Sequence, residues 1–256
     1  MKYAILSDIH ANLEALAAVL EDIESQAVDR LLCLGDVVGY GPDPVECLRT
    51  LDRYEVTLMG NHELALLAGA GQFRTTARRA IEWTRRELKG SEQGRAYLDR
   101  IQDLPVRYQN DGLLCVHGAP SDPINAYLLP DAGGTSARLK PQFDAFDRYC
   151  FVGHTHIPGV LEPGRPFERP DAMLMNLYLL AADTKAIVNV GSVGQPRDHD
   201  PRACYVVLDM DEDARGGSGA GLVFRRVAYD VERTVDKINH NRMLGDVLGQ
   251  RLRKGE

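Results

Sequence analysis

The sequence predicts one layered α/β domain, and three observations support this fold class. In the first half of the 256-residue chain, short apolar runs alternate with segments of helical periodicity. In the second half, runs of strand length follow one another with fewer helices between them. Neither an internal repeat nor a long linker divides the chain. We therefore expect a single domain over residues 1–256, with parallel βα units first and a more antiparallel sheet afterwards.

The first half predicts three strands, each followed by helical sequence. A buried strand over Lys2–Ser7 precedes a helix that Asn12 caps and whose apolar residues recur at 3.6-residue spacing from Leu13 to Ile23. The remaining elements are predicted at Arg30–Leu34 (strand), Asp43 to about Leu51 (helix, with Pro44 in its first turn), Glu55–Met59 (strand) and His62–Gln102 (mostly helical).

The second half predicts five strands and a closing helix. The strands are expected at Leu113–Val116, Arg148–Val152, Lys185–Val190, Ala203–Asp209 and Leu222–Val227, so the core extends to about residue 228. The closing helix runs from Asp230 to about Met243, and the charged residues Gln250–Glu256 predict a frayed tail. The Leu/Met-rich stretch within Arg169–Asp183 allows three interpretations: a core hairpin, a lid or a dimer contact. We favour the core hairpin.

Charge and composition exclude several classes of protein. A net charge of −7 argues against a general binder of duplex nucleic acid or of anionic membranes, since both need a basic face. The N-terminal apolar run is too short for a signal peptide, and no stretch approaches the roughly 20 apolar residues of a membrane span. The five cysteines form no CxxC pair, and four of them lie in apolar runs. These features predict a cytoplasmic protein with reduced thiols and leave its oligomeric state open.

Five predicted strands end with potential metal ligands at or just past the carboxyl end. In chain order these residues are Asp8 and His10, then Asp36, then Asn61 and His62, then His117, and finally His154 and His156. Ligand sites in open α/β sheets lie outside the carboxyl ends of the strands, so we expect these side chains to converge. Each residue alone has an ordinary explanation as a turn, a cap or a hydrogen-bonded histidine. Five of the seven histidines in one pattern nevertheless favour a metal site.

The types of donor atom indicate which metals would bind. The set mixes carboxylates, imidazoles and an amide and contains no thiolate, which suits Mn²⁺, Fe or Zn²⁺ better than a structural zinc site. Seven ligands exceed one tetrahedral site. They suit two divalent ions about 3.5–4 Å apart, the separation found in sites that cleave phosphoesters. We expect Mn²⁺, with Fe, Zn, Ni or Mg as alternatives.

Five ordered motifs make the chain resemble the calcineurin-like metallophosphoesterases. They are Asp8-Ile9-His10, Gly35-Asp36, Gly60-Asn61-His62-Glu63, His117-Gly118 and Gly153-His154-Thr155-His156. The resemblance covers residues 1 to about 210, and the strings SDIHANLEAL, GDVVGYGPDP and GSVGQPRD are similar to its small prokaryotic phosphodiesterase branch. It implies a four-layer α/β/β/α sandwich of two mixed sheets.

The resemblance also implies a role for each matching residue. The first metal would be held by Asp8, His10, Asp36 and His156, and Asp36 would bridge to a second metal held also by Asn61, His117 and His154. His62 matches the catalytic histidine that protonates the leaving oxygen or stabilises the charge on it. Two departures are visible: Gly35–Gly41 lacks the arginine of the family's GDxVDRG motif, and Val190 replaces the proline of NPGS. The missing arginine makes a phosphoprotein phosphatase a weaker candidate.

These residues predict a dinuclear phosphoesterase, most simply a phosphodiesterase acting on a small, nucleotide-like phosphodiester. The expected reaction is in-line attack on phosphorus by a metal-activated hydroxide, with His62 as general acid and Asn61 neutralising charge on the phosphoryl oxygens. Alternatives on the same site are a phosphomonoesterase or a nucleotide pyrophosphatase. Two other classes remain open: a metal-binding scaffold for protein interactions, and an α/β domain that binds no metal.

Loops near the strand ends are expected to select the substrate. These are Gly39–Pro44, Ala119–Gly134 and Gln195–Asp200. Arg197 is the candidate for gripping phosphate through its bidentate guanidinium, against the alternative of a solvated surface charge. Tyr40 is a candidate for stacking on a base, against the alternative of a hydrophobic plug.

Overall fold

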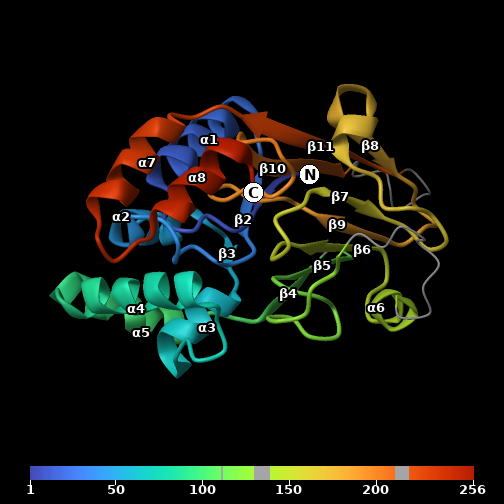
Figure 1. The fold of residues 1–256 in the computed structure, drawn as a ribbon. Coiled ribbons are helices and arrows are strands. Elements are labelled where there is room, and N and C mark those ends of the chain that lie inside the picture. The colour runs from blue at the N-terminus through green and yellow to red at the C-terminus, as the bar shows by residue number, and fades with distance from the viewer. Residues whose placement is uncertain (111, 130–138, 211–218) are drawn as a thin grey trace.

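Two mixed β-sheets packed face to face form the centre of the molecule (Figure 1). The structure is a computed structural model that describes residues 1–110, 112–129, 139–210 and 219–256. The first sheet combines the first three strands of the chain with three strands from its second half. From edge to edge its strands are β3 (Val56–Thr57), β2 (Arg30–Cys33), β1 (Lys2–Leu6), β10 (Ala203–Met210), β11 (Ala220–Val227) and β8 (Leu177–Leu180). β1, β2 and β3 are parallel, whereas β10, β11 and β8 are added in antiparallel fashion.

The second sheet has a parallel centre and antiparallel edges. Its order is β4 (Arg107–Asn110), β5 (Leu113–Val116), β6 (Tyr149–Val152), β9 (Ala186–Asn189) and β7 (Gly159–Leu161). β5, β6 and β9 are parallel, so their carboxyl ends lie at one edge of the sheet. The expected change from parallel to antiparallel pairing along the chain is present in the first sheet, whereas the later strands β5, β6 and β9 still pair in parallel in the second.

Side chains that alternate along each strand build the two faces of these sheets. On β1, Tyr3 and Ile5 point into the core between the sheets, while Ala4 and Leu6 point to the outer helices. On β6, Tyr149 and Phe151 face the same inter-sheet core. Fully buried strands of this kind appear in the sequence as continuous apolar runs, which is why they were predictable.

Helices cover the outer face of the first sheet and extend beyond its β3 edge (Figure 1). The helices are α1 (Leu13–Ser25), α2 (Pro44–Leu48), α3 (Asn61–Ala68), α4 (Thr75–Lys89), α5 (Glu92–Gln102), α7 (Val231–His240) and α8 (Asp246–Lys254). Over the outer face of the second sheet, α6 (Lys140–Asp144) packs Phe143 against Leu114 and Cys150. The order of layers is α/β/β/α, as predicted, and the last helical layer is thin in the part of the chain that is described.

Three local expectations need correction. The tail is helical up to Lys254, because Leu248 and Leu252 of α8 are buried in one cluster with Trp83 of α4. Its helical periodicity was not recognised in the sequence, since most of the residues around these two leucines are polar or charged. The strands β4 and β7 were not predicted, since both are short edge strands. Residues 169–183 form no core hairpin. They supply the edge strand β8, in which Tyr178 and Leu180 are buried while Leu177 and Leu179 are exposed.

Across the described ranges, no helix combines the length and the apolar character needed to cross a lipid bilayer.

Candidate metal centre

The predicted ligands meet where the carboxyl ends of β1, β2, β5 and β6 converge. Asp8 and His10 follow β1, Asp36 follows β2, and His117 follows β5. Each sheet supplies part of the cluster, so the centre lies at the junction between the two sheets. All seven predicted ligands are buried, although they span about 150 positions of sequence.

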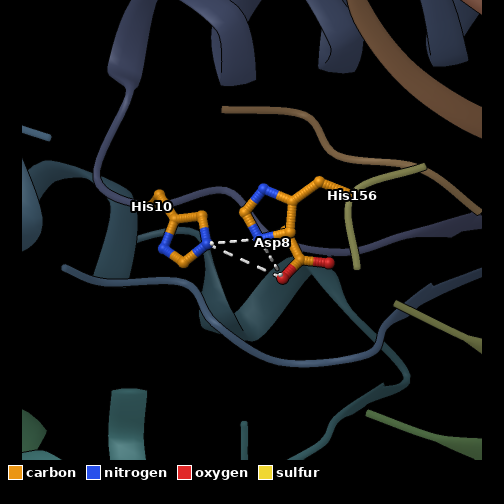
Figure 2. Close-up of side chains that lie close together, drawn as sticks. All are labelled: Asp8, His10 and His156. Carbon is orange, nitrogen blue, oxygen red and sulfur yellow. Dashed lines mark hydrogen bonds and ion pairs between the residues drawn. The ribbon is translucent and has the colours of Figure 1, made fainter. Parts of the chain in front are cut away.

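The first group of side chains is Asp8, His10 and His156 (Figure 2). The Nε2 atoms of His10 and His156 lie 3.2 Å apart. Asp8 Oδ1 lies 3.2 Å from His156 Nε2 and 3.6 Å from His10 Nε2. Three donor atoms from distant parts of the chain therefore face one point, as the ligands of a single cation would.

The second group is Asp36, His117 and His154, with Asn61 beside it. His117 Nε2 lies 3.2 Å from His154 Nδ1 and 3.0 Å from the Asn61 side-chain oxygen. Asp36 Oδ2 connects the two groups, because it lies 3.5 Å from His117 Nε2 and 3.7 Å from His10 Nε2. A carboxylate oxygen between two clusters of donors is the arrangement expected of a bridging ligand.

Main-chain carbonyl oxygens orient four of the five clustered histidines. The pairs are His10 Nδ1 with Val38 O at 3.2 Å, His117 Nδ1 with Leu34 O at 3.0 Å, His156 Nδ1 with Gln195 O at 2.5 Å, and His154 Nε2 with Asn125 O at 3.2 Å. A carbonyl oxygen can only accept, so the ring nitrogen beside it carries the proton. The other nitrogen of each neutral ring then directs its lone pair into the cluster, as in histidines that ligate metals.

The carboxylates are oriented by main-chain N–H groups. The N–H of His154 donates to Asp8 Oδ2 and the N–H of His62 donates to Asp36 Oδ1, both at 2.9 Å. The second oxygen of each carboxylate faces the cluster, and Asp8 Oδ1 has no hydrogen-bond partner among the described residues. A buried carboxylate oxygen without a donor fits a site built for a cation.

Two motif glycines permit this close approach. A Cβ at Gly60 would lie 2.1 Å from Asp36 Oδ1, and a Cβ at Gly153 would lie 2.5 Å from Asp8 Oδ2. Any other residue would displace the carboxylate that each glycine contacts. The glycine before Asn61 and the glycine before His154 therefore serve the geometry of the centre.

The protonation states of the cluster suit a cation as well. Burial raises the pKa of Asp8, but the surrounding histidines, His156 first, lower it more, so it lies well below its usual value. Burial is the main cause that lowers the pKa of His154 and His156 to about 4. Burial also lowers the pKa of His117, but Asp36 raises it more, to about 9. A proton on His117 thus occupies its inner nitrogen in the metal-free chain, and a bound cation would release it.

His62 lies in the cluster but differs from the other four histidines. Its Nε2 is 3.9 Å from Asp36 Oδ2, and its Nδ1 has no hydrogen-bond partner among the described residues. Proximity alone would allow His62 to join His10 and Asp36 as a ligand. Without a carbonyl to fix its tautomer, His62 is better suited to exchange a proton than to hold a cation. Burial lowers its pKa well below the usual value, with Asp36 acting in the opposite direction.

Glu63 supports the centre, although sequence reasoning gave it no role. Its carboxylate accepts hydrogen bonds from the main-chain N–H groups of Asp36 (2.8 Å), Gly60 (3.0 Å) and Val38 (3.2 Å). It is 1 % exposed, and burial, followed by the charge of Asp36, raises its pKa to about 7. The signal was present in the quoted GNHE motif, but its meaning depends on a loop that lies far away in sequence.

A cleft of about 650 Å³ opens in front of the cluster, and it is lined by all three residues predicted to bind substrate, Tyr40, Asn61 and Arg197. Arg197 donates to the Gln195 side-chain oxygen at 3.0 Å and to the Tyr40 hydroxyl at 3.5 Å. The Tyr40 ring lies 4.6 Å from the rings of both His10 and His62. Tyr40 therefore packs against the centre and also lines the cleft, and stacking on a base stays a prediction.

Tyr127 is a further cleft residue that the sequence did not single out. Its ring stacks on the ring of His154 with 3.8 Å between centroids, and 55 % of the residue is exposed. It belongs to the predicted substrate loop Ala119–Gly134, of which residues 130–134 lie outside the described residues.

Comparison with known proteins agrees with this geometry. A family model described as the calcineurin-like phosphoesterase superfamily domain matches residues 1–213. An uncharacterized protein of Methanocaldococcus jannaschii is 35% identical over 259 residues, which cover 97% of this chain and 96% of the relative. The crystal structure of a metallophosphoesterase from Sphaerobacter thermophilus aligns with a TM-score of 0.82 and 33% identity, over 100% of this chain and 99% of that one.

A third relative has a named activity but a shorter match. A symmetrical bis(5'-nucleosyl)-tetraphosphatase of Pseudomonas putida is 31% identical over 121 residues, 45% of this chain and 41% of the relative. The family match spans most of the chain, and the clustered donors are those that divalent metals take. The chain belongs to the calcineurin-like phosphoesterase superfamily and is a metal-dependent phosphoester hydrolase.

Proposed function

We propose that this chain is a dinuclear phosphodiesterase that hydrolyses a small, nucleotide-like phosphodiester. The observation that supports this most is the set of four histidines whose outer nitrogens contact main-chain carbonyls and whose inner nitrogens face two carboxylates. Two neutral imidazole nitrogens 3.2 Å apart repel each other unless a cation or a proton lies between them. The donor set therefore fits divalent cations at both groups.

The chain's residues divide into two ligand sets around Asp36. The first ion would be held by Asp8, His10, Asp36 and His156, and the second by Asp36, Asn61, His117 and His154. Mn²⁺ is the proposed ion, with Fe, Zn, Ni or Mg as alternatives, since the donors are carboxylates, imidazoles and an amide. When bound, such a pair supplies Lewis acidity and lowers the pKa of coordinated water.

His62 would act on the leaving oxygen of the substrate. Its low pKa favours a neutral ring with one N–H, which can donate to the departing oxygen as negative charge develops there. Its ring is held in place between Tyr40 and Phe73, at 4.6 and 5.2 Å between centroids. The main-chain N–H of His62 meanwhile orients Asp36, so one residue serves both the ion site and the leaving group.

Arg197 would bind the phosphoryl group from the open side of the cleft. The contacts with Gln195 and Tyr40 hold the guanidinium beside the metal centre and leave other N–H donors available. A bidentate contact with two phosphoryl oxygens would neutralise charge that grows during the reaction.

A second candidate is cleavage of a phosphoanhydride in a dinucleoside oligophosphate. The tetraphosphatase relative favours this candidate, because its named substrate is of that class. The family resemblance argues against it, because the dinucleoside tetraphosphatases of the superfamily carry the GDxVDRG arginine and Gly35–Gly41 of this chain lacks it. We therefore keep the phosphodiester as the main proposal.

Hydrolysis by metal-stripped protein, with and without added Mn²⁺, tests the proposal. The substrates are bis-p-nitrophenyl phosphate, p-nitrophenyl phosphate and diadenosine tetraphosphate, with His156→Ala as the inactive control. We expect Mn²⁺-dependent cleavage of the diester that the variant loses. Preference for the monoester would make the enzyme a phosphomonoesterase, and preference for the tetraphosphate would favour the second candidate. Full activity without metal would contradict the proposal.

A further inference from the structure

The lining of the cleft includes Phe73, Arg74 and Arg251 as well as residues of the metal centre. Phe73 and Arg74 lie in the connection between α3 and α4, and Arg251 lies in α8. The ring of Phe73 meets the ring of His62 nearly at a right angle, at 87°, which places this region on the His62 side of the centre. Asn125 and Tyr127 line the cleft next to His154.

Packing between α4 and α8 brings the two arginines to the same cleft. Ala80 and Trp83 of α4 share one buried cluster with Leu248 and Leu252 of α8. Both arginines therefore line one cleft, Arg251 from α8 and Arg74 from the position that precedes α4. Arg251 lies in Gln250–Glu256, the stretch predicted to fray, and it lines the cleft because this stretch is largely helical.

The guanidinium groups of the two arginines in this region are available to a ligand. Within the described ranges, neither Arg74 nor Arg251 donates a side-chain hydrogen bond or forms an ion pair, whereas Arg197 has two such contacts. No side chain caps the amino end of α4, and Thr76 and Ala77 of its first turn also line the cleft. The helix dipole therefore adds to the positive potential. Glu256 also lines the cleft and brings negative charge there, and its side-chain carboxylate lies 3.8 Å from Lys254 Nζ.

We propose that this region is the leaving-group subsite and that it takes a nucleotide, a leaving group that carries a base and a phosphate of its own. The inference rests on the proposed function, because His62 donates to the leaving oxygen and the leaving group must then lie on the His62 side. The partly exposed ring of Phe73 offers a surface for a base. Arg74 and Arg251 offer guanidinium donors for the second phosphate.

Hydrolysis of such a substrate needs water as its sole co-reactant. The oxygen of water forms a bond to phosphorus, and the bond from phosphorus to the 3′ oxygen of the leaving nucleotide breaks. One proton of the water ends on that 3′ oxygen, by way of His62. The products are two nucleotides with 5′ phosphates, and no oxidant or further reactant is needed.

The experiment compares the dinucleotide ApC with pApC, which differs only by a 5′ phosphate on the adenosine. We expect the Mn²⁺-loaded protein to cleave pApC to pA and pC, with kcat/KM at least about tenfold above that for ApC, since charge-assisted contacts give strong selectivity. Arg74→Ala and Arg251→Ala should each lower this ratio, and the double variant should bring it to about 1. Arg79→Ala is the matched control, because Arg79 is an exposed, unpaired arginine of the same helix that does not line the cleft, and it should keep the ratio.

Each other outcome has a distinct meaning. Products pAp and C would show that the phosphorylated nucleoside is not the leaving group, and would overturn the subsite. A ratio near 1 in the unaltered protein, or a ratio that the arginine variants do not change, would also overturn it. In both cases cleavage of bis-p-nitrophenyl phosphate would leave the proposed function standing. Inactivity of the metal-loaded protein on all diesters would overturn both proposals.

Discussion

Five of the eight residues that converge on the metal centre adopt main-chain conformations that few L-residues adopt. The φ angles are 56° for Asp8, 49° for His10, 51° for Asp36, 64° for His154 and 61° for His156. Each left-handed residue of this kind costs on the order of 1 kcal/mol, so the surrounding structure has to hold the loops in place. Main-chain strain that is concentrated at one site indicates that the shape of these loops is determined by the needs of the metal centre and not by the conformational preferences of their residues.

Replacement of His62 tests its role in a way that depends on the leaving group. A dinucleotide loses an alkoxide, whereas bis-p-nitrophenyl phosphate loses a stabilised phenolate. We expect His62→Ala to slow dinucleotide cleavage by about 10²–10⁴-fold, and cleavage of the p-nitrophenyl diester by less than about tenfold. His240→Ala, in an exposed histidine of α7, is the control. An equal loss on both substrates would contradict the role of His62 as an acid.

Replacement of Glu63 tests whether its hydrogen bonds to the main chain stabilise the loop that carries Asp36. Both Glu63 oxygens accept N–H groups, so the amide of Glu63→Gln would face a main-chain donor with its own NH₂ group. We expect a loss of about 1–3 kcal/mol in the free energy of unfolding of the metal-free protein. Affinity for Mn²⁺ should fall by about 10–100-fold. The exposed Glu87→Gln serves as control in denaturant titration and metal titration; if both variants behave alike, Glu63 has no such role.

At the scale of elements, one ionic contact fastens α1 to the first sheet. Asp22 of α1 accepts hydrogen bonds from Arg225 of β11 at 2.7 and 3.0 Å, and from the Tyr205 hydroxyl of β10 at 2.6 Å. The hydrogen bond from Arg225 is the main cause that lowers the pKa of Asp22. The folded protein therefore binds fewer protons at this site than the unfolded chain does.

This contact should make stability depend on pH in a defined direction. A lowered folded-state pKa gives stabilisation that is present above the unfolded pKa of about 4 and is lost as the pH falls through the folded pKa. Because the pair is partly exposed, we expect Asp22→Asn to cost only about 1–2 kcal/mol at pH 7. In unfolding curves the difference should shrink as the pH falls below about 4 and vanish once the folded-state carboxyl of Asp22 is protonated. Glu21→Gln, on the exposed face of α1, should show no such pH dependence, and a pH-independent difference for Asp22→Asn would contradict the argument.

The sequence predicted those elements whose pattern is local. Buried strands such as β1 and β6 form apolar runs, and α1 has both a helical period and the Asn12 cap, whose side chain accepts the N–H of Ala15 at 3.2 Å. Short edge strands such as β7 have no such pattern, because pairing with a neighbour defines them. The α8 helix was missed because only Leu248 and Leu252 show its buried face among charged residues.

The residues of the candidate site were likewise predictable where the pattern is local and not predictable where distant segments meet. Strand ends followed by Asp, Asn or His were visible in sequence, and the structure brings all eight of those residues together. Glu63, Tyr127 and Arg251 were missed, since each acts across a contact between loops or helices that no local pattern encodes. Residue type and position at a strand end thus predict a metal centre better than they predict its support or its substrate cleft.

At the scale of the whole molecule, two mixed sheets bring the carboxyl ends of their strands to one place. The first sheet contributes Asp8 and Asp36, and the second contributes His117 and His154. A cation bound between them would link the two sheets and stabilise the folded state over the unfolded one. We therefore expect the melting temperature of the metal-stripped protein to rise with Mn²⁺ concentration, and His156→Ala to reduce that rise. A melting temperature that does not respond to any divalent ion would favour an α/β domain that binds no metal.

The number of metal ions per chain tests the central claim most directly. Metal-stripped protein is titrated with Mn²⁺ by calorimetry, bound metal is measured by elemental analysis, and hydrolysis of bis-p-nitrophenyl phosphate is followed at each step. The two ligand groups joined by Asp36 predict two ions per chain and activity that rises with occupancy. His156→Ala should keep one ion and lose most of the activity. One ion or none in the fully active protein would contradict the dinuclear account.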